Sequence, residues 1–254
     1  MNQQQFQMAV PLTPMVKRLI IACAVIWIGG ILILQGLVLG GRPVDEIFAL
    51  SPYMVVTRFW IWQLLTYMFL HSTNVFHILF NMLSLWWFGA ELETRWGGRF
   101  FLAFYLACGV GAGVIYTAAT YAYYYFTGNT VPMTNELVGA SGAVYGLLLA
   151  YGLLFGERMI FFMMLFPMKA KYFTMIIGLV ELVTLMDSTS GSKAASLAHL
   201  GGLVAGFVFL AAVARWRSRG SASAGSKRGR RLKLVVNNDR QSSEEPGNGP
   251  KYWN

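Results

Sequence analysis

Six long apolar runs constrain this chain more than any other feature of its sequence. They cover residues 19–40, 76–90, 100–123, 138–155, 172–186 and 194–213. A run of about 20 apolar residues can cross a bilayer as a helix, because a helix satisfies its own backbone polar groups. The chain is 56% hydrophobic and only 12% charged, whereas soluble domains carry about 25% charged residues. We therefore predict an all-α, polytopic membrane protein with six transmembrane helices.

One further apolar stretch, residues 61–70, is too short to span a membrane. We expect it to form an interfacial or re-entrant loop between the first two spanning helices. Such a loop is stable only where it packs against protein, because lipid chains cannot form hydrogen bonds with its backbone N–H and C=O groups.

The distribution of basic residues predicts the orientation. If the N-terminus lies in the cytoplasm, all Lys and Arg residues except Arg42, Arg58 and Lys193 are also cytoplasmic. Cytoplasmic loops are enriched in Lys and Arg, so we expect both termini inside and a multi-pass protein of the plasma or inner membrane. The predicted organisation is an N-terminal segment 1–18, a membrane domain 19–214 and a basic, disordered tail 215–254. We expect the tail to bind anionic lipid headgroups rather than nucleic acid, for which no motif is present.

Three reactive side chains fall at one predicted depth. His77, Ser141 and His199 lie near the starts of the second, fourth and sixth runs. In the predicted topology those three helices all run inward, so each side chain lies within about two turns of the outer surface. Ionisable side chains inside a membrane usually mark a functional site. Ser141 is a candidate nucleophile and His199 a candidate general base, which indicates hydrolysis within the membrane.

Glycine spacing favours an approach of these two residues. Gly142 and Gly146 are four residues apart, as are Gly202 and Gly206. Small residues at this spacing let transmembrane helices pack closely. Close packing of the fourth and sixth helices would bring Ser141 within hydrogen-bonding reach of the imidazole, although the same spacing is also explained by ordinary helix packing.

Other polar and aromatic residues share the same faces. His77 and Asn81 are four residues apart and project from one side of a helix. They are candidate donors to an oxyanion, or Asn81 simply bonds a neighbouring helix. Tyr145 lies one turn below Ser141 and either stacks on His199 or fills space.

No acidic partner for the imidazole is evident in the sequence. Glu91 and Glu93 lie at the opposite end of the second helix, and Asp187 is expected to be solvated. Glu181 lies about two turns inside the fifth helix and faces either the bundle interior or a partner. The expected catalytic group is therefore a Ser–His dyad without a carboxylate.

Metal binding and disulfide formation are alternatives that the sequence does not favour. His71, His77 and His199 could serve as zinc ligands of a transporter, but no acidic or Cys companion is clustered with them. Cys23 and Cys108 are far apart and expected to be buried apolar residues. We expect no metal and no cofactor.

Four ordered motifs resemble the rhomboid family of intramembrane serine proteases, and the resemblance covers about residues 19–213. They are His77-Ile78-Leu79-Phe80-Asn81 (the family's His-x-x-x-Asn), the Gly- and Glu-rich turn 89–97, Gly139-Ala140-Ser141-Gly142 (Gly-x-Ser-Gly), and Ala198-His199-Leu200-Gly201-Gly202 continuing to Gly206. The motifs occur together, in the order and spacing typical of the family.

The resemblance implies a six-helix bundle whose active site opens outward into a water-filled cavity. It implies Ser141 as nucleophile, His199 as base, and His77, Asn81 and the Ser141 backbone N–H as oxyanion donors. Gly139, Gly142, Gly202 and Tyr145 would support the site, with Tyr145 packed on the catalytic imidazole. The expected substrates are transmembrane segments of other membrane proteins, cleaved through an acyl-enzyme.

Two features of the first external loop stand apart. The family often has Trp-Arg there, whereas this chain reads Trp62-Gln63, which puts the anchoring of the loop in question. His71 is near a loop histidine of the family and is interpreted as structural.

The alternative function is that of a non-catalytic rhomboid-like protein that escorts membrane clients, an interpretation suited to relatives that lack the serine or the histidine. The sequence identifies neither a substrate nor an oligomeric state.

Overall fold

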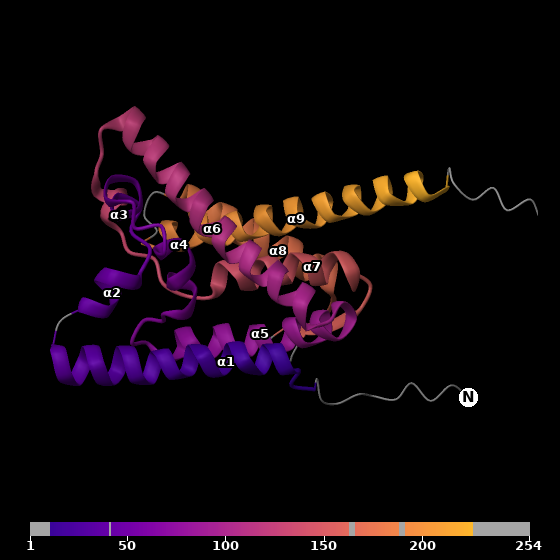
Figure 1. The fold of residues 1–254 in the computed structure, drawn as a ribbon, viewed down its shortest axis with the longest axis horizontal. Helices are drawn as coiled ribbons and strands as arrows, with labels where there is room; N and C mark the ends of the chain where they lie inside the picture. The colour runs from indigo at the N-terminus through magenta and orange to yellow at the C-terminus, as the bar shows by residue number, and fades with distance from the viewer. Residues whose placement is uncertain (1–10, 41, 163–165, 188–190, 226–254) are drawn as a thin grey trace, which may run out of the picture. The chain divides into compact units, whose positions relative to one another are not determined.

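A computed structural model describes residues 11–40, 42–162, 166–187 and 191–225. In chain order the elements are α1 (Pro14–Val25), the π-helical η1 (Ile26–Leu39), α2 (Pro43–Phe48), α3 (Pro52–Arg58), α4 (Gln63–Thr66), η2 (Tyr67–Phe69), α5 (Val75–Trp96), α6 (Gly98–Thr127), η3 (Val131–Thr134), α7 (Ser141–Leu154), β1 (Met159–Phe162), β2 (Phe166–Lys169), α8 (Ala170–Met186) and α9 (Lys193–Gly225). The chain divides into two compact units, Met1–Val213 and Ala214–Asn254. Within the first unit, α1 and α5 pack side by side (Figure 1).

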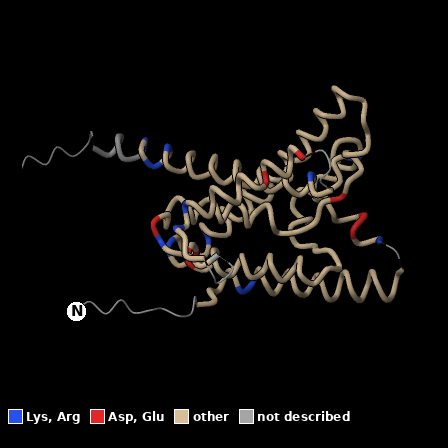
Figure 2. The backbone as a smooth tube through the Cα atoms, turned by 180° about the vertical axis from the view of Figure 1, so that it is seen from behind, with Lys and Arg blue, Asp and Glu red and all other residues tan. Residues whose placement is uncertain are grey.

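Each predicted apolar run coincides with a helix. Among the described residues, four helical stretches are long and apolar enough to cross a membrane: Pro14–Leu39, Val75–Trp96, Gly98–Thr127 and Lys193–Arg219. Figure 2 shows long uncharged stretches in these helices, with charged residues gathered mainly near the helix ends. The all-α, polytopic fold class is therefore confirmed. The number of six spans stays a prediction, because α7 and α8 have only 14 and 17 residues.

The first helix begins at Pro14, earlier than the predicted start at residue 19. The Glu93 carboxylate, at the far end of α5, accepts hydrogen bonds from the backbone N–H groups of Met15 and Val16, both at 2.9 Å, and from the Thr13 hydroxyl. N–H groups in the first turn lack partners within their own helix, and a carboxylate there also complements the helix dipole. Long-range capping by Glu93 thus stabilises an earlier start.

The last helix extends beyond the predicted end of the membrane domain. It continues to Gly225, so residues 215–225 are helical where a disordered tail was predicted. Between the apolar run and Gly220 the chain has no Gly or Pro, so nothing in the local sequence stops the helix before that glycine. The rest of the predicted tail, 226–254, lies outside the described residues.

A short β-hairpin joins α7 to α8 and was not predicted. Strands β1 and β2 pair antiparallel, with Met159 opposite Lys169 and Phe162 opposite Phe166. Aromatic and β-branched residues favour such pairing. The Glu157 carboxylate accepts a hydrogen bond from the Lys169 ammonium at 2.7 Å and closes the base of the hairpin.

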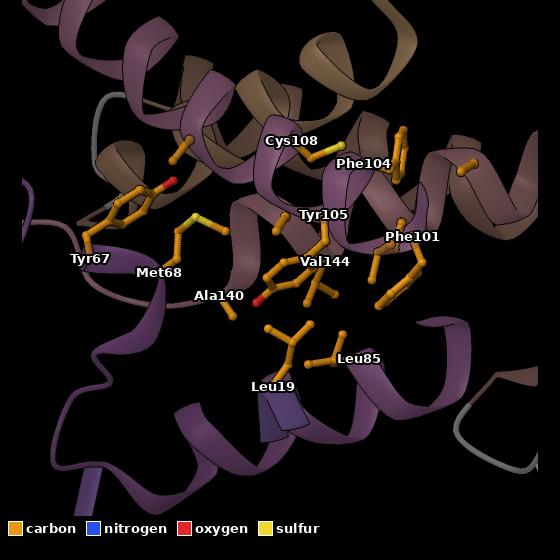
Figure 3. Packing of buried hydrophobic residues seen from close by; sticks show 14 of the residues in the cluster. Leu19, Tyr67, Met68, Leu85, Phe101, Phe104, Tyr105, Cys108, Ala140 and Val144 are labelled. Atoms are coloured by element: carbon orange, nitrogen blue, oxygen red, sulfur yellow. The ribbon is translucent and has the colours of Figure 1, made fainter. Parts of the chain in front are cut away.

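The core is centred on the contact of α6 with α7 (Figure 3). The side chains of Phe101, Phe104, Tyr105 and Cys108 on α6 are fully buried, and Val144 on α7 is almost so. Figure 3 shows Tyr67 and Met68 of η2 and Leu85 of α5 flanking this group. Both cysteines are buried and free, as predicted. The core holds α7, and with it the last two residues of the Gly139–Gly142 motif, in a fixed position.

The loop before α5 is anchored by Gln63. Residues 61–70 form the short helices α4 and η2, as expected of a segment that does not span. The fully buried Gln63 amide donates to the carbonyl oxygens of Glu46 and Ile47 at 3.3 and 3.2 Å, and its oxygen accepts from the Ser51 N–H at 3.1 Å. Gln63 therefore provides the anchoring that the absence of Arg had put in question.

Candidate active site

Ser141 is the first residue of α7, where the chain turns sharply into the helix. The turn requires Gly139, whose φ of +123° is strained for any residue with a side chain. The Gly139 N–H donates to the Tyr67 carbonyl oxygen at 2.9 Å, which ties the turn to the preceding loop. Because the first N–H groups of a helix are unpaired within it, the Ser141 N–H is available to bind a negatively charged oxygen.

His199 meets Ser141 across the contact of α7 with α9. Its Nε2 lies 2.8 Å from the Ser141 Oγ. The two helices touch through glycine: a Cβ on Gly202 would stand 1.9 Å from the Gly142 carbonyl oxygen, and one on Gly206 would stand 3.3 Å from the Gly146 Cα. The predicted close packing of the two glycine pairs is present, and it brings the nucleophile and base candidates into contact.

Tyr145 packs on the imidazole as expected. The ring centroids of Tyr145 and His199 are 4.1 Å apart and the planes differ by 8°, which is a parallel stack. The Tyr145 hydroxyl donates a hydrogen bond to the Glu181 carboxylate of α8. The stack fixes the plane of the imidazole, and the hydroxyl connects it to a third helix.

A carboxylate that was not predicted also lies beside His199. The Glu181 Oε1 lies 3.0 Å from the His199 Nδ1, on the side of the ring opposite Ser141. The expectation of a site without an acidic neighbour is therefore wrong. Glu181 lies five residues before Met186, where α8 ends, and His199 six residues after Lys193, where α9 begins. Because the chain reverses between the two helices, these side chains reach the same depth.

His77, the third residue of α5, lies on the other side of the serine turn. Its Nδ1 is 3.0 Å from the Ser72 Oγ and 3.3 Å from the Ser72 N. Its Nε2 points to Gly139, where an added Cβ would stand 2.8 Å away. If the Ser72 N–H donates to Nδ1, the proton of a neutral His77 is on Nε2 and is directed at the serine turn. Sequence reasoning missed Ser72, which lies outside the helices.

Asn81 lies one turn below His77 on the same face. Its amide donates to the His77 carbonyl oxygen at 2.8 Å, and the side chain is nearly buried. The amide group carries a second N–H that can donate to another acceptor. The structure thus supports the predicted shared face of His77 and Asn81 without testing their role.

His71 is completely buried beside His77, with the two ring centroids 5.3 Å apart. Neither of its ring nitrogens makes a well-formed hydrogen bond to a described residue. Burial, and secondarily the neighbouring His77, lower the pKa of His71 to about 4, against a weaker opposing effect of the Phe69 backbone. His71 is therefore neutral near pH 7 and packs behind the site rather than in it.

Among the described residues, the three histidines have no acidic or Cys partners placed to complete a metal site. In the described parts of the chain, no group of three or more His, Cys, Asp or Glu side chains is placed to hold a metal ion.

Glu181 is the residue near the site to which sequence reasoning assigned no role. An ionisable residue inside an apolar helix was the available signal, but its partner became identifiable only from the folded chain.

Comparisons with known proteins find similarity to rhomboid proteins. Residues 58–216 match the family model described as Rhomboid domain. The chain is 32% identical to YdcA of Bacillus subtilis (strain 168) over 208 residues, which are 81% of this chain and 91% of YdcA. It is 28% identical to the rhomboid protease GlpG of Salmonella paratyphi A over 196 residues, 76% of this chain and 60% of that protein. It is 30% identical to the rhomboid protease GluP of B. subtilis over 158 residues, 60% of this chain and 26% of that protein.

The model match covers more than half of the chain, and residues 58–216 include every residue of the candidate site. The apolar helices and this match agree on an integral, multi-pass membrane protein. The chain belongs to the rhomboid family.

Proposed function

We propose that the protein is an intramembrane serine endopeptidase that cleaves transmembrane segments of other membrane proteins. The observation that carries the proposal is the 2.8 Å contact of the His199 Nε2 with the Ser141 Oγ, formed between two apolar helices. A serine hydroxyl needs an adjacent base to act as a nucleophile, and this distance is within the range for proton transfer. The names of the relatives GlpG and GluP, both rhomboid proteases, support the same activity.

The first half of the reaction forms an acyl-enzyme. The Ser141 Oγ attacks a peptide carbonyl carbon of an unwound substrate segment while its proton passes to the His199 Nε2. The C–O bond forms as the carbonyl double bond opens to an oxyanion. When the oxyanion collapses, the C–N bond breaks and the proton on Nε2 passes to the leaving amine.

The oxyanion lies at the N-terminus of α7 in this proposal. The Ser141 backbone N–H, the His77 Nε2–H and the free N–H of the Asn81 amide are its donors. Water then attacks the acyl-enzyme with His199 again as base, which releases the new carboxyl terminus and restores Ser141. Gly139, Gly142 and Gly202 support these steps because each permits a close contact that a side chain would block. A Cβ would stand 2.8 Å from the His77 Nε2 at Gly139, 2.7 Å from the Ala112 Cβ at Gly142 and 1.9 Å from the Gly142 carbonyl oxygen at Gly202.

The proposed cellular arrangement follows from the positive charges. Both termini lie in the cytoplasm and the site opens toward the outer face, because basic residues gather at the opposite helix ends. The membrane domain extends over residues 19–214, with lipid as its environment and single-pass or other transmembrane proteins as substrates. No cofactor takes part in the proposed chemistry.

The test is cleavage of a transmembrane reporter by the purified protein in detergent and in liposomes. Ser141→Ala and His199→Ala are expected to abolish cleavage while the thermal unfolding curve remains close to that of the wild type. A fluorophosphonate reagent is expected to label the wild type at Ser141 and to leave Ser141→Ala unlabelled. Undiminished cleavage by either variant would falsify the proposal, and unlabelled wild type that cleaves nothing would favour a client-binding role.

A further inference from the structure

We propose that Glu181 is a positioning residue for His199, so that the site works as a Ser141–His199–Glu181 triad rather than a dyad. The inference rests on the proposed function, since it concerns the base of that reaction. It follows from the placement of one carboxylate oxygen behind the imidazole.

A single oxygen of Glu181 meets both members of the aromatic stack. Oε1 accepts the hydrogen bond of the Tyr145 hydroxyl and lies 3.0 Å from the His199 Nδ1. The Ser196 hydroxyl of α9 also interacts with this carboxylate. Donors from α7 and α9 thus converge on one group of α8, and both Glu181 and His199 are largely buried, with side-chain exposures of 12% and 16%.

The position of the carboxylate selects the useful tautomer of the imidazole. A carboxylate is an acceptor only, so the nitrogen that faces it is favoured as the protonated one. If the proton is on Nδ1, then Nε2 carries the lone pair, and Nε2 is the atom 2.8 Å from the Ser141 Oγ. Glu181 therefore favours the form of His199 that can accept the serine proton.

The same carboxylate stabilises the charge that forms during the reaction. When the Ser141 proton moves to Nε2, the imidazole becomes an imidazolium with an N–H on each side. An adjacent carboxylate lowers the energy of this cation, and does so more strongly in a buried site than in water. Glu181 keeps its own charge throughout, and no proton leaves Nδ1.

The distance between the Nδ1 and the carboxylate is short, but the direction is not yet that of a hydrogen bond. The His199 Nδ1 has no hydrogen-bond partner of good geometry among the described residues. The last torsion of a glutamate side chain is soft, and catalytic hydrogen bonds often align only when substrate binds. A rotation of the carboxylate about that torsion would align the contact without moving a helix.

The alternative is that Glu181 only holds Tyr145 against α8. The two roles are separable by substitution. Tyr145→Phe removes the hydroxyl and keeps the stacked ring and the carboxylate, whereas Glu181→Gln keeps the shape and removes the charge. Glu91→Gln is the matched control, because Glu91 is also partly buried and ion-paired, with Arg158, but lies at the opposite end of α5.

The first measurement is kinetics on a transmembrane reporter as a function of pH. We expect kcat of Glu181→Ala to fall about 100-fold or more, toward the loss of about 10⁴-fold known for triad aspartates, with KM changed less than about threefold. In Glu181→Gln the acid limb of the pH profile is expected to move to lower pH by about one unit, because a nearby negative charge no longer favours the imidazolium. Glu181→Asp keeps the charge and is expected to keep the limb in place.

The side chains that determine the position of the acid limb come from three helices. His199 interacts with Glu181 of α8, with Tyr145 of α7 and with His77 of α5. His77 is unchanged in every variant of the series, so its contribution cancels. If Tyr145→Phe shifts the limb as much as Glu181→Gln does, the effect passes through Tyr145 and the proposal is overturned.

The second measurement does not depend on activity. The chain has three histidines, so ¹⁵N-histidine NMR in detergent gives a simple spectrum that His199→Gln assigns. We expect His199 to carry its neutral proton on Nδ1 in the wild type and to become a mixture of tautomers in Glu181→Ala. If the wild type cleaves and the Glu181 variants match it in kcat, pH profile and tautomer, the proposed role of Glu181 is wrong and the proposed protease function is unaffected. If no reporter is cleaved but the tautomer still depends on Glu181, the proposed function is wrong and the effect of Glu181 on the His199 tautomer is confirmed.

Discussion

Gly202 and Gly142 lie in direct backbone contact, and this contact sets the distance between the nucleophile and base candidates. A Cβ on Gly202 would stand 1.9 Å from the Gly142 carbonyl oxygen and 2.7 Å from its carbonyl carbon. Both obstacles are backbone atoms, so no side-chain rotation can relieve them. Gly142 directly follows Ser141, and Gly202 lies about one helical turn after His199. The contact between the helices therefore fixes the positions of the two candidate residues.

We expect Gly202→Ala to separate α7 from α9 and to lower kcat by about 100-fold or more, since a displacement of about 1 Å at a catalytic group can cost that much. The measurement is reporter cleavage together with thermal unfolding. Gly29→Ala is the control, because a Cβ at Gly29 meets nothing within 4 Å. A fully active Gly202→Ala enzyme would mean that the helices are free to separate without loss.

Gly139→Ala is expected to damage the site in two ways. Its φ of +123° is strained for alanine, and its Cβ would stand 2.8 Å from the His77 Nε2. We expect a loss of stability and a fall in kcat, because the clash displaces His77, the proposed oxyanion donor. Gly97→Ala separates the two effects: φ is +80° there but nothing lies within 4 Å, so that variant should lose stability and keep its kcat.

Most of the site was predictable from the sequence because its residues belong to regular helices. Depth along a helix follows from counting residues, and His77, Ser141 and His199 are indeed the third, first and seventh residues of α5, α7 and α9. The close approach of α7 and α9 followed from glycine spacing, a property of two neighbouring faces. These inferences needed only local periodicity and the apolar pattern.

The missed features depend on contacts between elements distant in sequence. Glu181 became a neighbour of His199 only through the packing of α8 against α7, and Glu93 caps a helix 78 residues away from it. A carboxylate in an apolar helix signals that a partner exists without saying which one. The Gln63 anchor was missed similarly, since its partners are backbone groups of a loop without periodicity.

Gln63→Ala tests that anchor. The substitution leaves the buried Ser51 N–H without its acceptor and removes two donors to carbonyl oxygens. An unsatisfied buried polar group costs about 1–3 kcal/mol, so we expect a clear fall in the unfolding temperature. Thr57→Ala is the control, since the Thr57 hydroxyl is exposed and donates a hydrogen bond to the Tyr53 carbonyl within the same short helix. Equal stability of the two variants would show that the loop is held by other contacts.

His71 is expected to make the protein less stable in acid. Its pKa is lowered to about 4 in the folded protein by burial, whereas an unfolded histidine titrates near about 6.5. Between these two pH values the unfolded chain binds a proton that the folded chain excludes, so stability falls as pH decreases from about 6.5 to 4 and the effect levels off below. The difference corresponds to about 3 kcal/mol in total.

Thermal unfolding in neutral detergent across this range should show a steeper decline for the wild type than for His71→Gln, whose side chain does not titrate. The comparison uses the slope with pH, so a constant loss of packing in the variant does not affect it. Parallel curves for the two proteins would mean that His71 takes up its proton as readily in the folded state as in the unfolded one.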